Sequence, residues 1–270
     1  MGEPIIHQSG GRSGRRFSVL ALHGFPGTPD DWRALQAQSS GAWLTPNMPW
    51  LYTTDRHLPN APLTLRNVVE QVLSFTHAQT QLPIHLVGHD LGGAIAWWIA
   101  AMFPQVVVSL TVISAPHPQV YADARPQLQA DGRLAYLHDL VTDSGDAPLK
   151  PEPLLAALQR ETEATSQVLH GLAQSNPAAV RSLYQNTLTD AALAGTAHFP
   201  DLVLPLFYFQ GQNDPYFPSD LCDATLRASG SLASSKLVSG AGHFPQLTHA
   251  TDMAKTLDAF WVYAESVMGV

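Results

Sequence analysis

The stretch Pro83-Ile-His-Leu-Val-Gly-His-Asp-Leu-Gly-Gly93 indicates the fold class of this chain. It begins as a short apolar run, typical of a buried strand, and it leads into apolar residues with helical spacing from Leu91 to Phe103. Gly88 and Gly92 lie two residues before and two after Asp90, so the backbone can bend sharply there. The stretch predicts a strand, a tight turn that presents the Asp90 side chain, and a helix. The alternative is an ordinary turn aspartate that caps the helix.

The rest of the chain alternates short apolar runs with helical patterns, which predicts an α/β fold with a mostly parallel central sheet flanked by helices. We expect strands at Ile5–Gln8, Phe17–Leu22, Ala42–Thr45, Ile84–Gly88, Val107–Ile113, Leu204–Gln210 and Lys236–Val238. We expect helices at Leu65–Ala78 (N-capped by Thr64), Leu91–Phe103, Asp220–Ala228 and Gln246–Val267.

One segment breaks this alternation. Residues 117–205 lack a convincing apolar strand and show helical patterns separated by polar, Pro-containing joints. We therefore expect residues 1–116 and 206–270 to form a core domain, and residues 117–205 to form an inserted helical cap (lid). The cap is expected at the face where α/β sheets bind ligands.

Composition and charge exclude several classes of protein. The 270 residues are 45% hydrophobic and 13% charged, with a net charge of -8, which argues against disorder and against nucleic-acid binding. The single cysteine, Cys222, has no partner for an internal disulfide, and no Cys/His spacing suggests zinc, so we expect no metal and no cofactor. No apolar run reaches the roughly 20 residues of a membrane helix, and the first residues carry no signal segment. The expectation is a cytoplasmic monomer or homodimer without a membrane or nucleic-acid partner.

Chain order supports a catalytic role for Asp90. An elbow nucleophile is followed in the chain by an acid after a later strand and then by a histidine. Asp214 follows the strand expected at Leu204–Gln210, and His243 follows the one that ends at Val238. The order predicts a catalytic triad of Asp90, Asp214 and His243.

A loop after the first long strand predicts an oxyanion hole. His23-Gly-Phe-Pro26 follows the strand at Phe17–Leu22, and the expected donors are the backbone N–H groups of Phe25 and Leu91. We expect His23 to brace this loop rather than to react. Residues near these motifs are expected to line a substrate pocket: Pro26, Trp32, His117, Phe217 and Phe244.

With these motifs the chain resembles the α/β-hydrolase superfamily and, within it, the epoxide hydrolase branch. The resemblance covers most of the chain and rests on His23-Gly-Phe-Pro26, Gly88-His-Asp-Leu-Gly-Gly93, Ser114-Ala-Pro-His-Pro118, Gly211-Gln-Asn-Asp214 and Gly242-His-Phe244. It implies the α/β-hydrolase fold with an inserted helical cap and without the family's first strand.

The chemistry of an aspartate nucleophile narrows the reaction. A carboxylate is ionised at neutral pH and can attack saturated carbon without a base, giving an ester that water activated by His243 then hydrolyses. An opened oxirane also needs proton donors for its oxygen. In epoxide hydrolases two cap tyrosines supply them, and the resemblance assigns this role to Tyr136 and Tyr184, although Tyr184-Gln-Asn186 replaces the family's Tyr-Arg-Asn. The expected substrates are a small-molecule epoxide and water.

Two other functions remain open at this point. A haloalkane or haloacid dehalogenase uses the same Asp-His-Asp triad, but haloalkane dehalogenases usually follow the nucleophile with Trp, where this chain has Leu91, and no tryptophan lies in the expected cap. A non-catalytic binding protein on the same scaffold is the third possibility, against which the complete triad argues.

Overall fold

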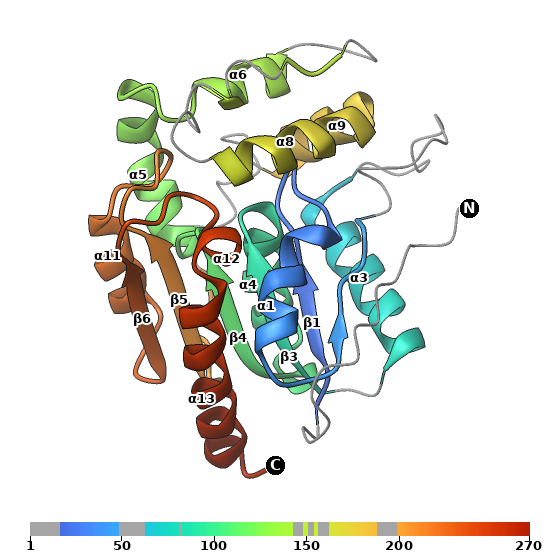
Figure 1. The fold of residues 1–270 in the computed structure, drawn as a ribbon, viewed down its shortest axis with the longest axis vertical. Helices are drawn as coiled ribbons and strands as arrows, with labels where there is room; N and C mark the ends of the chain where they lie inside the picture. Colours follow the sequence, from blue (N-terminus) through green and yellow to red (C-terminus); the bar gives the residue numbers. More distant parts are fainter. Residues whose placement is uncertain are drawn as a thin grey trace.

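The computed structural model describes residues 17–48, 63–80, 83–142, 148–150, 154–155, 162–187 and 199–270 (Figure 1). The strand expected at Ile5–Gln8 lies outside these residues. No helix in this part of the chain combines the length and the hydrophobicity that a bilayer span requires.

A single six-stranded sheet forms the centre of the described structure, and all its neighbouring strands run parallel. The strand order is β2-β1-β3-β4-β5-β6. The strands are β1 (Val19–Leu22), β2 (Trp43–Leu44), β3 (Ile84–His89), β4 (Val107–Ile113), β5 (Leu206–Gly211) and β6 (Ala233–Val238). The predicted α/β fold with a parallel sheet is therefore confirmed.

The edge strand β6 begins at Ala233, whereas the sequence placed its start at Lys236. Its first residues, Ala233-Ser-Ser235, are only partly buried or exposed, because β6 pairs with β5 alone and lies at the end of the sheet order. A strand that is not buried on both faces carries no continuous apolar run, so the pattern missed this part.

Alternate residues of the strands face two separate helical layers, as the pleat requires. Val19 and Ala21 of β1 pack in one apolar cluster with α1 (Arg33–Gln38) and α13 (Ala250–Met268), which lie in front of the sheet in Figure 1. Leu20 and Leu22 pack in a second cluster with α3 (Leu65–Gln79) and α4 (Leu91–Met102). The other described helices outside the expected cap are η1 (Pro29–Trp32), η2 (Pro104–Val106), α11 (Asp220–Ala228) and α12 (Pro245–Thr248).

Helix boundaries agree with the sequence pattern except near the C-terminus. Thr64 caps α3 by accepting a hydrogen bond from the Asn67 N–H at 3.3 Å, as expected. The single helix expected at Gln246–Val267 is wrong, because His249 has φ -130° and ψ 29° and separates α12 from α13. Neither glycine nor proline marks this break, so periodicity could not reveal it.

The described part of residues 117–205 contains helices and no strand. These helices are α5 (Pro118–Ala130), α6 (Ala135–Thr142), α8 (Thr162–Gln174) and α9 (Pro177–Thr187), of which α6, α8 and α9 lie over the carboxyl ends of the strands in Figure 1. Their buried hydrophobic side chains, such as Leu128, Val168 and Leu183, belong to the same apolar cluster as α3 and α4. The division into a core of 1–116 and 206–270 and a cap of 117–205 stays a prediction.

Candidate active site

The turn between β3 and α4 holds Asp90 in a strained backbone conformation. Asp90 has φ 51° and ψ -120°, a region that costs a non-glycine residue about 1 to 3 kcal/mol. Its N–H donates to the Ile113 carbonyl at 3.1 Å, which fixes the turn against β4. A Cβ on Gly92 would lie 2.1 Å from the Leu22 carbonyl oxygen, so only glycine lets the turn approach β1 this closely. The Asp90 side chain does not cap α4 in the way that an ordinary N-cap residue does.

Three side chains form the hydrogen-bonded series that the sequence predicts. His243 Nε2 lies 3.3 Å from Asp90 Oδ2, and His243 Nδ1 lies 2.9 Å from Asp214 Oδ2. The other oxygen of Asp214, Oδ1, accepts hydrogen bonds from the N–H groups of Tyr216 at 2.8 Å and Phe217 at 3.1 Å. The acid is therefore held by its own loop while it orients the imidazole. This is the geometry of a triad.

The loop after β1 supplies the expected backbone donor. The Phe25 N–H donates to Asp90 Oδ1 at 3.1 Å, and a hydrogen bond from the Leu91 N–H helps to lower the pKa of Asp90. A Cβ on Gly24 would lie 2.6 Å from the Asp90 Cβ, so this loop can approach the carboxylate only with glycine there. His23 braces the loop, because its Nδ1 donates to the Gly24 carbonyl at 2.8 Å and its Nε2 accepts from the backbone N–H of Met48 at 3.2 Å.

The two carboxylates control the protonation of His243. Burial opposes a charged imidazole, but the charge of Asp214 and hydrogen bonds to Asp214 and Asp90 raise the pKa of His243 to about 10. Burial also opposes ionisation of Asp90, yet the hydrogen bond and charge of His243 lower the pKa of this carboxyl below its ordinary value. At neutral pH the resting site holds an imidazolium between two carboxylates.

A second histidine beside the site stays neutral. Burial lowers the pKa of His89 to about 4. Its Nε2–H donates to the His243 carbonyl at 2.9 Å, and the two rings lie 5.0 Å apart between centroids. His89 therefore positions the backbone of His243.

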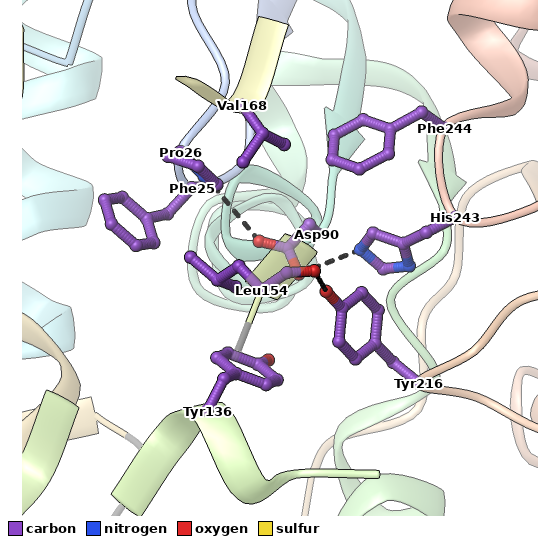
Figure 2. Close-up of a pocket in the computed structure, with 9 residues that line it drawn as sticks. All are labelled: Phe25, Pro26, Asp90, Tyr136, Leu154, Val168, Tyr216, His243 and Phe244. Atoms are coloured by element: carbon purple, nitrogen blue, oxygen red, sulfur yellow. Dashed lines mark hydrogen bonds and ion pairs between the residues drawn. The ribbon is translucent and has the colours of Figure 1, made fainter. Parts of the chain in front are cut away.

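A small pocket opens over Asp90 and His243 (Figure 2). Its walls are mostly apolar, and two tyrosines, Tyr136 and Tyr216, contribute to it. The other lining residues are Phe25, Pro26, Leu154, Val168 and Phe244. Burial and then the neighbouring Tyr184 raise the pKa of Tyr136 well above 10, so this phenol keeps its proton. Among the described residues, no group of three or more His, Cys, Asp or Glu side chains could hold a metal ion.

The structure brings most of the predicted site residues together and separates a few. Pro26, Phe244 and Tyr136 line the pocket, and Phe217 lies beside it with its ring 5.9 Å from that of His243. Tyr184 is buried to 2% exposure and packs edge-on against Phe25 at 5.8 Å, so it lies next to the pocket lining.

Two predicted pocket residues belong elsewhere. Trp32 is fully buried in the apolar cluster under α1 and α13, with its ring 6.3 Å from that of Trp43. His117 packs edge-on against Trp97 at 5.1 Å, and its Nδ1 accepts from the Gln119 N–H at the start of α5. Both residues are close to a motif along the chain, but neither is among the residues that line the pocket.

Sequence reasoning missed three pocket residues. Tyr216 follows Asp214 by two positions, and its ring contacts His243 at 4.7 Å and Tyr136 at 5.1 Å between centroids. Its hydroxyl donates to the Leu154 carbonyl at 3.3 Å (Figure 2). An aromatic residue two positions after the acid was a usable signal for Tyr216. Leu154 and Val168 carry no signal in the sequence, because only the packing of the cap brings them to the pocket.

Comparison with known proteins identifies the family. A family model described as the alpha/beta hydrolase fold matches residues 18–250. The chain belongs to the α/β-hydrolase fold family. The predicted resemblance to epoxide hydrolases within this family is supported by relatives of that name. This α/β-hydrolase is 30% identical over 107 residues to epoxide hydrolase 4 of Homo sapiens, a match that covers 39% of the chain and 30% of the human protein.

This α/β-hydrolase also matches a lipase in sequence and an epoxide hydrolase in structure. A triacylglycerol lipase of Pseudarthrobacter phenanthrenivorans is 35% identical over 112 residues, covering 38% of the chain and 34% of the lipase. Among solved structures, the inhibitor complex of Bacillus megaterium epoxide hydrolase superposes with a TM-score of 0.75 at 18% identity, over 94% of this chain and 96% of that one. At this identity the superposition supports the fold alone. The chain matches only about a third of the length of these curated relatives.

Proposed function

We propose that this α/β-hydrolase is an epoxide hydrolase that opens an oxirane to a vicinal diol through an ester on Asp90. The observation that carries the proposal is an aspartate at the strained elbow, hydrogen-bonded to His243 and facing Tyr136 across an apolar pocket. An aspartate at the elbow argues against ester and amide substrates, because enzymes that hydrolyse those bonds favour Ser or Cys as the nucleophile.

The first step is alkylation of Asp90. An oxygen of the carboxylate attacks a ring carbon, the carbon–oxygen bond of the oxirane breaks, and its electron pair stays on the ring oxygen. The Tyr136 phenol gives its proton to this oxygen. Oδ1 is held by the Phe25 N–H in the oxyanion hole, so we assign the attack to Oδ2, which gives up its hydrogen bond to His243 as the ester forms.

Alkylation also changes the charge around His243. The new ester carries no charge, so the imidazolium loses the Asp90 charge that helped to raise its pKa. The proton of His243 is then passed to the Tyr136 phenolate. His243 becomes a neutral base, oriented by Asp214.

The second step is hydrolysis of the ester. His243 takes a proton from a water molecule, and the hydroxide attacks the Asp90 carbonyl carbon. The Phe25 and Leu91 N–H groups hold the developing oxyanion, each worth about 3 kcal/mol in such sites. The tetrahedral intermediate then collapses, and the bond between its carbon and the diol oxygen breaks. The leaving diol oxygen takes the proton of the hydroxyl group that came from water, which restores the Asp90 carboxylate beside protonated His243. The cycle returns to the resting charge state that the pKa values describe.

The pocket lining favours an epoxide over a halogenated substrate. A leaving halide needs N–H donors such as indoles, and a haloacid also needs a cation for its carboxylate. The residues described around the pocket include no tryptophan, arginine or lysine. They do include two phenols, which suit an oxygen leaving group.

Single turnover in ¹⁸O-labelled water tests the covalent mechanism. With enzyme in excess over a terminal epoxide, the first diol should contain no label and peptides that contain Asp90 should gain it. Label wholly in the first diol would show direct water attack. A parallel assay for halide release from haloalkanes and haloacids should stay at background, and rapid halide release without diol formation would favour the dehalogenase.

A further inference from the structure

Helix α8 contacts the loop His23–Pro26, which supplies the Phe25 N–H, through close approach of Gly171 to the Pro26 backbone. A Cβ on Gly171 would lie 1.5 Å from the Pro26 carbonyl oxygen and 2.7 Å from its carbonyl carbon. Both are backbone atoms, so no side-chain movement could relieve the clash. Any residue larger than glycine must push α8 away from the loop.

Val168 is one helical turn before Gly171 and lies on the same face of α8. It is 1% exposed and lines the pocket, while its neighbour Leu169 points outward with 45% exposure. Figure 2 shows Val168 and Tyr136 on opposite sides of Asp90. The Val168 methyl groups therefore bound the space in which a substrate sits over the nucleophile.

The pocket is small, and among the described residues that line it only Asp90 and His243 carry charge. The space open to the centre of a water-sized sphere is only about 10 Å³, roughly what one ordered water needs. A substrate that fits is compact and uncharged, with one oxygen acceptor for a phenol.

We propose that Gly171 and Val168 set the substrate size limit of this enzyme. Gly171 lets α8 approach the Pro26 carbonyl, and this approach brings Val168 over Asp90, so that small uncharged epoxides are selected over bulky ones. The proposal rests on the proposed function for the identity of the substrate. The size limit itself belongs to the pocket and can be measured without turnover.

The test compares Val168→Ala, Gly171→Ala and a control, Leu169→Ala, which alters the outward face of the same helix. The first readout is the ratio of kcat/KM for 1,2-epoxybutane to that for a bulky aryl glycidyl ether. The second readout is binding, by calorimetry, of two neutral amides, butyramide and 6-phenylhexanamide. An amide offers a carbonyl oxygen to Tyr136 and an N–H to Asp90, so it reports on the pocket whether or not the protein turns over epoxides.

Val168→Ala should shift both ratios about tenfold toward the bulky ligand, the low end of what one or two methyl groups decide in an apolar pocket. Gly171→Ala should shift them in the same direction and should lower the melting temperature, although Gly-to-Ala changes inside helices ordinarily stabilise. Leu169→Ala should leave both ratios unchanged.

Unchanged amide preference in Val168→Ala, in a folded protein, would overturn the size limit even if epoxides are hydrolysed. A Gly171→Ala protein with a raised melting temperature and the original preference would overturn the role of Gly171. If the amide preference shifts as expected while no epoxide is opened by any variant, the size limit stands and the proposed function falls.

Discussion

In the proposed mechanism, the single residues Asp90 and His243 divide the chemistry between two half-reactions. Asp90 needs no base for attack, since His243 lowers the pKa of its carboxyl. Water does need a base. The structure supplies one only after the charge of Asp90 has been removed, because both carboxylates raise the pKa of His243.

Replacement of His243 should therefore stop the cycle after alkylation. We expect His243→Gln to accumulate the ester on Asp90 and to lose steady-state turnover by at least about a thousandfold, as removal of triad members does elsewhere. Intact-protein mass spectrometry after exposure to an epoxide measures the adduct. Asp90→Ala should give no mass increase under the same conditions. A folded His243→Gln protein that binds substrate without forming the adduct would contradict this division of labour.

Tyr136 should act in the other half-reaction. Tyr136→Phe should slow alkylation roughly tenfold to a hundredfold, because a hydrogen bond to a developing charge is worth about 1.5 to 3 kcal/mol. Hydrolysis of the ester should slow less than alkylation, because in this variant the alkoxide of the opened ring can take the His243 proton in place of the Tyr136 phenolate. Stopped-flow measurement of the two phases separates them. Tyr184→Phe is the matched comparison, since Tyr184 packs beside the pocket at Phe25. An equal loss in both variants would show that two phenols share the leaving oxygen, and no loss in Tyr136→Phe would remove this tyrosine from the mechanism.

The loop after β5 that carries Asp214 is held by hydrogen bonds with elements of the expected cap. Arg133, in the turn between α5 and α6, donates from Nη1 to the Pro215 carbonyl at 2.8 Å and to the Asp214 carbonyl at 3.4 Å. The Tyr216 hydroxyl adds a contact to the Leu154 carbonyl. Residues of the expected cap thus contact the loop that positions Asp214.

Loss of the Arg133 contact should weaken this loop. We expect Arg133→Met, which keeps the aliphatic stem, to lower the free energy of unfolding by about 1 to 2 kcal/mol, a value reduced by the partial exposure of Arg133. Ester hydrolysis should slow more than alkylation, because Asp214 acts only through His243. Urea denaturation and single-turnover kinetics measure the two effects. Arg66→Met is the control, since Arg66 makes only an exposed pair with Glu70 at 3.8 Å. Equal effects from the two variants would mean that Arg133 does not hold the loop.

The buried charges of the triad should make the stability of the whole molecule depend on pH. The pKa of His243 is raised from 6.5 to about 10 in the folded protein. Below pH 6.5 the group is protonated in both states and its stabilisation is fully present. Between pH 6.5 and 10 only the folded state keeps the proton, so stability falls as pH rises. Melting temperatures should therefore decline faster over this range in the natural protein than in His243→Gln. Parallel curves for the two proteins would contradict the raised pKa.

The sequence by itself determined the parallel sheet, the elbow at Asp90, the hydrogen-bonded series of Asp90, His243 and Asp214, and the backbone donor at Phe25. These features depend on local signals, because a buried parallel strand needs an unbroken apolar run and a sharp turn needs glycine at fixed positions. Tertiary structure alone decided the position of Trp32 and His117 away from the pocket, the arrival of Leu154 and Val168 in it, and the break at His249. Each of these depends on how helices pack against one another and on the sheet, and contacts between distant segments leave no periodic pattern in the chain.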